Sequence, residues 1–266
     1  MSVSGSTAKA ARKYVPKRNW LATFAYIILA LYVAYALSLF DVSGARLVQG
    51  LGHGADFIGR MMPPNFERYN LLIEGLLESI QIAIIATTAG VILSLPVGFL
   101  AARNLMPAWV TWPARALIVA CRSFHPVIVA ILFVKAVGFG ALAGTLALIV
   151  ASIGFIAKLF AEAIEEISLK QIEAIRATGA PFSSVITYGV LPQVMGRFIG
   201  FTSYQLDSNL RNSTMVGIVG AGGIGGTLFA AFQRFDYDFV SAILIAIIAV
   251  IMVAEGINNV MRKLYR

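Results

Sequence analysis

Charged residues and cysteines are both scarce in this sequence. Only 13% of its 266 residues are Asp, Glu, Lys or Arg, while 59% are hydrophobic. Soluble domains typically contain about 25% charged residues, so this composition excludes an ordinary soluble protein. The single cysteine, Cys121, excludes a disulfide framework and a metal site built from cysteines. We therefore expect an all-helical membrane protein without a metal site.

Long apolar runs are abundant instead. A helix needs roughly 20 apolar residues to cross about 30 Å of hydrocarbon. Three stretches of that length contain no charged residue, and three more are shorter or contain a few charges. About six transmembrane helices are therefore expected, at Trp20–Phe40, Ser79–Ala102, Ala114–Val134, Ala136–Ala157, Gln193–Gly217 and Phe239–Ala254.

Lys and Arg gather at the two ends of the chain, in residues 1–19 and 261–266. Cationic segments beside spans tend to stay in the cytoplasm, so both ends are expected to be cytoplasmic tails of a multi-pass protein of the cell membrane, inner or plasma. An even number of spans agrees with this. The net charge of +8 then reflects topology and contact with anionic membrane lipid, not nucleic-acid binding.

The expected organisation places the first transmembrane helix at residues 20–40 and a glycine-rich external loop, containing a short amphipathic helix, at residues 41–74. The main transmembrane domain follows at residues 75–260. No internal repeat is visible, which argues against a duplicated secondary transporter.

A polar helix with its own start and stop signals interrupts the apolar chain at residues 168–178. Ser168 is placed as its N-cap, and Gln171 follows at capping-box spacing. Gly179 suits the left-handed position after a helix, and Pro181 prevents continuation. By the orientation above, this helix faces the cytoplasm.

Apolar side chains recur along this helix at a spacing of three, at Leu169, Ile172 and Ile175, and Glu173 and Arg176 have the spacing of a surface ion pair. Apolar side chains on a water-facing helix predict insertion into a groove of a soluble partner. The alternative is an amphipathic helix lying on the membrane, against which the absence of Trp and Phe counts.

Glu173-Ala174 precedes Gly179 by a fixed interval, and nine residues separate Gly179 from Gly189, which leads into Leu191-Pro192. This arrangement resembles the signature of permease subunits of ATP-binding-cassette (ABC) importers, which reads Glu-Ala-Ala, three residues, Gly, nine residues, Ile-x-Leu-Pro. Ile175 replaces the second Ala and Gly189 replaces the Ile. The resemblance implies the type I ABC importer permease fold over about residues 75–260. It also implies that residues 168–178 are the coupling helix, which sits in a cleft of the ATPase subunit, with coupling residues Glu173, Ala174, Arg176, Gly179, Leu191 and Pro192.

Three further segments are similar to phosphonate-transport permeases: Lys158–Glu165, Arg176–Ala180 and Tyr188–Gln193. The resemblance implies uptake of a phosphonate, phosphite or hypophosphite by two permease subunits, expected to be a homodimer. They would work with two ABC ATPase subunits and a periplasmic or extracellular substrate-binding protein. ATP and Mg would bind to the ATPase, so this chain is expected to bind no cofactor and to be a transport subunit and not an enzyme.

Glycines gather between Gly217 and Gly226, where Gly220, Gly222 and Gly225 satisfy the spacing G-x-G-x-x-G of dinucleotide-binding proteins. No alternation of strand and helix surrounds them, and no Lys-Ser or Lys-Thr follows as in a P-loop. Glycines in membrane segments more often allow close helix contact or break a helix at a gate. The expected gate, at the external end of the pathway, comprises Gly217, Gly220, Gly222 and Gly223.

Ionisable side chains within spans usually face the bundle interior or an aqueous path. Arg122 and His125 are three residues apart and are expected on one face of one helix. A path for an oxyanion gains from fixed positive charge and hydrogen-bond donors. The candidate pathway residues are Arg122, His125, Asp207, Asn209 and Arg211.

Structural alternatives remain for these side chains. Asp207 and Arg211 are four residues apart and can neutralise each other on one helix, His125 can bond a neighbouring backbone group, and Lys158 can extend to the cytoplasmic interface. Other functions also remain open: an ABC permease for another small solute such as methionine, a membrane scaffold, or an ion-coupled carrier, for which Asp207 is the only acid well inside a span.

Overall fold

The computed structural model describes residues 20–40 and 43–264, which form helices and loops without a strand. The expected all-helical class is therefore confirmed. The basic tail at residues 1–19 lies outside the described residues, as do the last two residues of the expected C-terminal tail. The chain divides into two compact units, Met1–Ile58 and Gly59–Arg266.

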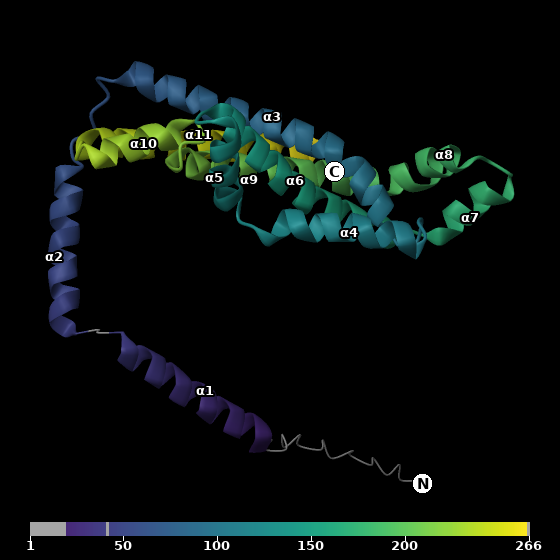
Figure 1. Ribbon diagram of the computed structural model, residues 1–266, viewed down its shortest axis with the longest axis horizontal. Helices are drawn as coiled ribbons and strands as arrows, with labels where there is room; N and C mark the ends of the chain where they lie inside the picture. Colours follow the sequence, from purple (N-terminus) through teal and green to yellow (C-terminus); the bar gives the residue numbers. More distant parts are fainter. Residues whose placement is uncertain (1–19, 41–42, 265–266) are drawn as a thin grey trace, which may run out of the picture. The chain divides into compact units, whose positions relative to one another are not determined.

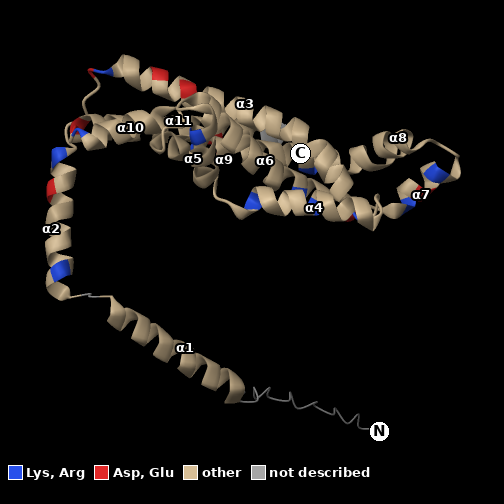
Figure 2. Cartoon of the chain, in the orientation of Figure 1, with Lys and Arg blue, Asp and Glu red and all other residues tan. Residues whose placement is uncertain are grey.

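The first unit contains α1 (Trp20–Leu39) and most of α2 (Gly44–Arg60). None of the residues of α1 is buried, and the helix carries no charge (Figure 2). In α2, Leu47, Leu51 and Ile58 share one face and polar residues occupy the other, which is typical of a helix along a membrane surface. The expected external loop at residues 41–74 is thus largely helical, and its last six residues belong to α3.

The second unit is a helical bundle in which α3 packs along α6 and α9 contacts both (Figure 1). A short segment containing α7, α8 and the π-helical turn η1 joins α6 to α9. In chain order the elements are α3 (Tyr69–Ala101), α4 (Ala108–Ser123), α5 (Pro126–Val137), α6 (Ala141–Glu165), α7 (Leu169–Ala177), α8 (Phe182–Ser184), η1 (Val185–Val190), α9 (Leu191–Ile218), α10 (Ile224–Gln233) and α11 (Tyr237–Leu264).

Among the described residues, four helices are long and apolar enough to cross a membrane: α1, α3, α6 and Tyr237–Asn258 of α11. A fifth is added if α4 and α5 count as one broken span. The expected span Gln193–Gly217 lies in α9, which has the length but is not among the apolar helices. The count of six therefore depends on α9, in which Gln205, Asn209 and Ser213 are polar residues buried by packing.

The expected continuous span Ala114–Val134 is wrong, because the chain bends by 90° between α4 and α5. Proline disfavours the helical conformation in the residue before it, and His125, which precedes Pro126, is extended with φ −65° and ψ 142°. Phe124 is extended as well. Arg122 lies in the last turn of α4 and His125 caps α5, so the expectation that they share one helix face is also wrong.

Small residues bring α3 close to α6. Every fourth residue of α3 from Ile82 to Gly98 is buried, including Gly90. A Cβ atom at Gly90 would overlap the Cβ of Ser152 in α6, and one at Gly98 would lie 2.7 Å from Cδ1 of Phe160. Close approach of this kind stabilises helix pairs in lipid, where the hydrophobic effect between helices is lost.

A buried polar network joins α3, α6 and α9. The amide of Asn209 donates to Oγ1 of Thr87 (2.9 Å) and to Oγ of Ser152 (2.8 Å). Gln205 donates to Oγ of Ser152 (3.0 Å) and to Oδ1 of Asn209 (2.9 Å). Asn209 is completely buried, so this candidate pathway residue connects helices in the structure and does not line an open path.

We predict that Gly90→Ala destabilises the bundle by about 1–3 kcal/mol, because the added methyl group forces α3 away from α6. The matched control is Gly196→Ala in α9, where an added Cβ meets no atom within 4 Å. That change should be neutral or stabilise by up to about 1 kcal/mol, through helix propensity alone. The free energy of unfolding in detergent measures both, and equal effects would contradict the packing argument.

Candidate functional site

The segment between α6 and α9 begins with α7, whose N-cap is Ser168, as expected. The expected capping box is wrong, because the Ser168 side chain makes no cap hydrogen bond. Gln193 of α9 takes its place: its Oε1 accepts from the Ser168 N–H (3.1 Å), while its Nε2 donates to the carbonyl of Gly189 (2.6 Å). One side chain thus ties the start of α7 to η1 and α9.

The end of α7 is where the sequence places it. Thr178 is the C-cap, and Gly179 follows in the left-handed region with φ +75°. The Gly179 N–H donates to the carbonyl of Arg176 at 3.0 Å. The helix therefore ends within the chain's own hydrogen bonding, before Pro181.

The apolar side chains of α7 divide between inside and outside. Ile172 is buried and Ile175 is half-buried, both facing η1, where a Cβ at Gly189 would lie 3.2 Å from Cδ1 of Ile175. The expectation that these two residues insert into a partner is therefore wrong. Leu169 is exposed, and the outer face also presents the side chains of Glu173, Ala174 and Arg176. The expected ion pair between Glu173 and Arg176 does not form.

A π-helical turn precedes the Leu191-Pro192 pair. The ring of a proline clashes with the carbonyl four residues earlier in an α-helix, which for Pro192 is that of Tyr188. The wider turn of η1, from Val185 to Val190, leaves room for this ring at the start of α9. These two residues therefore shape the entry into α9.

The glycine-rich loop lies at the opposite end of α9, about 40 Å from α7 by helix length. Gly220, Gly222 and Gly223 have φ between +81° and +84°, a conformation that favours glycine. The loop is held by α3, where Glu78 Oε2 accepts from the Gly223 N–H and Ser79 Oγ from the Ile224 N–H, each at 2.9 Å. Gly217 packs as closely, since a Cβ there would lie 2.8 Å from Cα of Gly225.

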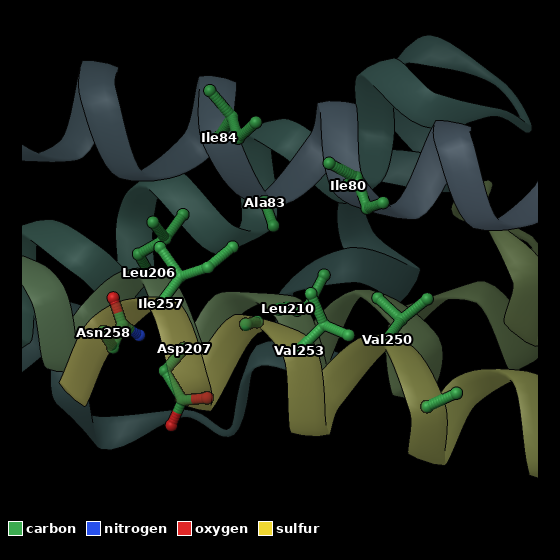
Figure 3. A pocket seen from close by; sticks show the side chains of 12 residues that line it. Ile80, Ala83, Ile84, Leu206, Asp207, Leu210, Val250, Val253, Ile257 and Asn258 are labelled. Carbon is green, nitrogen blue, oxygen red and sulfur yellow. The ribbon is translucent and has the colours of Figure 1, made fainter. Parts of the chain in front are cut away.

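Asp207 and Arg211 form an ion pair on α9, with Oδ2 and Nη1 2.7 Å apart. The alternative that they neutralise each other is confirmed. Asp207 lies with Asn258 at one end of a groove of about 430 Å³ between α3, α9 and α11, and apolar side chains line the rest (Figure 3). A groove with an almost wholly apolar lining, whose one carboxylate is already paired, offers no donor charge to an anion.

His125 bonds a neighbouring backbone group, as its structural alternative proposed. Its Nδ1 accepts from the Val127 N–H at 3.3 Å and caps α5. Arg122, at the end of α4, lines a second cavity of about 350 Å³ together with Arg115, Lys158 and Glu162. This cavity gathers cations and is the better place for an anion.

Nothing in the sequence places Arg122 beside Lys158, because α4 and α6 are separated in the chain. The ion pair between Lys158 and Glu162 could have been predicted, since these residues have helical i,i+4 spacing. Gln193 and Glu78 were missed because their partners are backbone groups. Among the described residues, no group of three or more His, Cys, Asp or Glu side chains is placed to hold a metal ion.

Two relatives align with most of this chain. This chain is 41% identical over 206 residues to the phosphate-import permease protein PhnE of Mycolicibacterium smegmatis. The aligned segment covers 77% of this chain but only 39% of that protein. This chain is 40% identical over 244 residues to the phosphite transport system permease protein PtxC of Stutzerimonas stutzeri, which covers 91% of this chain and 87% of the relative.

The fold is similar to a permease chain in an inward-facing structure of the MetNI methionine ABC transporter, with a TM-score of 0.66 and 22% identity over 76% of this chain and 99% of that one. Residues 94–266 match the family of the binding-protein-dependent transport system inner membrane component. The expected type I importer fold is confirmed. This chain belongs to that family, the permease subunits of ABC importers, which are transport subunits of the inner membrane and not enzymes.

Proposed function

We propose that this permease imports a small phosphorus oxyanion, such as a phosphonate, phosphite or hypophosphite, driven by ATP hydrolysis on a separate subunit. The observation that carries the mechanism is α7, a short helix whose inner face is fixed to its own chain and whose outer face is exposed. Such a helix can transmit force from a partner into the bundle.

The transmission follows from what α7 touches. Ile172 packs in one cluster with Phe160 and Ile164 of α6 and with Val190 and Val194 around the start of α9. Gln193 adds a hydrogen-bonded link at the start of α7. When the two ATPase subunits close on ATP, α7 moves as a rigid lever and tilts α6 and α9 together. The coupling residues are Glu173, Ala174 and Arg176 on the outer face, Gly179 at its end, and Leu191 and Pro192 at the pivot.

The names of the relatives support a phosphorus oxyanion as the cargo. The two relatives described above, at 40% and 41% identity, are named for phosphite transport and phosphate import. The methionine transporter supports the fold alone at 22% identity. Arg122 and His125, beside the break between α4 and α5, are exposed candidate pathway residues that carry donor groups, whereas the exposed Arg211 is paired with Asp207. A binding protein on the outside delivers the anion.

The arrangement in the membrane is also part of the proposal. Both termini and α7 face the cytoplasm, and the glycine-rich loop, with Gly217, Gly220, Gly222 and Gly223, gates the external end of the pathway. Residues 75–260 form the transmembrane domain, and two copies of this chain make the pathway between them, each bound to one ATPase subunit. ATP and Mg bind to the ATPase.

We predict that liposomes containing this permease with its ATPase take up radiolabelled phosphite or methylphosphonate when ATP and the loaded binding protein are supplied. An ATPase whose P-loop lysine is replaced should abolish uptake, because no other energy source is coupled. Uptake that continues without the ATPase would identify an ion-coupled carrier, although the pairing of Asp207 with Arg211 disfavours one. A complex that moves methionine and no phosphorus oxyanion would contradict the cargo.

We predict that Gly179→Val abolishes ATP hydrolysis linked to transport, while the protein remains inserted and dimeric. A β-branched residue at φ +75° is strained by about 1–3 kcal/mol, which displaces the end of α7. Gly179→Asn is the matched control, since asparagine tolerates this conformation and an added Cβ meets no atom within 4 Å. ATPase activity and uptake in proteoliposomes measure both variants, and normal coupling in the valine variant would disprove the lever.

We predict that a cysteine at Glu173, in a Cys121→Ala background, reacts with a membrane-impermeant maleimide only after cells are permeabilised. The exposed outer face of α7 makes the thiol accessible once the reagent reaches the cytoplasm. Addition of the ATPase subunit to inside-out vesicles should then protect the thiol. Labelling of intact cells would reverse the proposed orientation.

A further inference from the structure

A cationic pocket lies between α4, α6 and the end of α3, with a volume of about 350 Å³. We define it by Arg115, Arg122, Lys158 and Glu162, and its apolar walls include Ile118 and Val119. Cations on two different helices line this one cavity, next to apolar side chains, and the side chain of Arg122 is exposed. Ionisable groups within membrane segments are costly and usually functional.

Only part of this charge is used by the protein itself. Arg115 is engaged twice, with Nη2 2.7 Å from Oε1 of Glu165 and Nε donating to the Ala101 carbonyl at 3.0 Å. Lys158 and Glu162 are 3.4 Å apart, a longer contact between half-exposed side chains. Within the part of the chain that the structure describes, Arg122 has neither an ion pair nor a hydrogen bond.

Close packing brings together the two helices that carry Arg122 and Lys158. A Cβ at Gly154 of α6 would lie 2.7 Å from Cγ of Arg122 and 3.1 Å from Cβ of Cys121, so α4 crosses α6 in close contact at this glycine. Lys158 follows Gly154 by four residues and lies on the same face of α6. Arg122 and Lys158 both line this cavity.

We propose that Arg122 and Lys158 bind the phosphorus oxyanion transiently as it crosses the membrane. This inference rests on the proposed function. Arginine offers two parallel donors to an oxyanion and lysine a compact charge, while Ile118 and Val119 accommodate the carbon or hydrogen substituent that distinguishes phosphonates and phosphite from phosphate.

Glu162 sets the strength of this site. Its carboxylate pairs with the ammonium group of Lys158 when no anion is present, so an arriving anion must displace the carboxylate. A site in a transport pathway has to release its cargo, which favours weak binding. Glu162 is thus a built-in competitor that returns to Lys158 as the anion leaves.

A membrane offers the same chemistry from a second source, the phosphate of an anionic lipid headgroup. We assign the pocket to the free anion for two reasons. Ile118 and Val119 lie beside the cations, where they can contact the substituent on phosphorus. Glu162 competes for Lys158, which suits a cargo that must be released. The experiment below separates the two sources by lipid composition.

The test measures equilibrium binding of radiolabelled phosphite to the permease–ATPase complex, without binding protein, in phosphatidylcholine nanodiscs. We expect Arg122→Gln and Lys158→Gln each to weaken binding about tenfold or more, the loss of a charge-assisted hydrogen bond. Glu162→Gln should strengthen binding about tenfold and slow uptake. Lys135→Gln, an exposed cation of α5 outside the pocket, is the matched control and should change nothing.

Opposite signs at Lys158 and Glu162 separate a binding site from general damage, since misfolding weakens binding in every variant. Unchanged phosphite binding in the Arg122 and Lys158 variants, with normal uptake by the wild-type complex, would overturn this site but not the proposed function. Effects that appear only when phosphatidylglycerol is added would assign the pocket to lipid and overturn the inference. A wild-type complex that neither binds nor moves a phosphorus oxyanion would overturn both.

Discussion

The contact between α3 and α6 is the constraint on which the bundle depends. Lipid surrounds these helices, so burial of apolar side chains contributes little to their association, and close approach through small residues takes its place. Gly90 permits that approach at Ser152, and the same Ser152 then reaches Asn209 of α9. Three helices are thereby held in one register, which fixes where the α7 segment and the glycine-rich loop emerge.

The two ends of α9 are fixed in the same way, by hydrogen bonds between a side chain and the backbone of a neighbouring segment. At one end Gln193 joins α7 to η1, and at the other Glu78 and Ser79 of α3 hold the backbone of the glycine-rich loop. In both places a side chain from a distant helix satisfies backbone N–H groups that lack partners at a helix start. Tilting of α9 must therefore act on both ends together.

The sequence was sufficient for the features that depend on local chemistry. The helical class, the bounds of α7 at Ser168 and Gly179, and the pairing of Asp207 with Arg211 follow from composition, capping and spacing. The features that depend on contacts between helices were missed or wrong. Ile172 looked like a docking residue because its burial against η1 is invisible in the sequence, and the break at Pro126 was hidden in a run whose hydropathy is continuous. The placement of Arg122 and Lys158 at one cavity depends on the crossing of α4 and α6 at Gly154.

Gly189 has a consequence for how importer parts can be exchanged. The usual isoleucine at this position of the signature would be crowded here, because an added Cβ would lie 3.2 Å from Cδ1 of Ile175 and that side chain would have to shift. Isoleucine in place of Gly189 would therefore press α7 outward, away from η1. An ATPase adapted to the position of α7 with glycine at this site would meet α7 in a different position with isoleucine. Two importers can therefore share the signature and still not exchange their ATPase subunits.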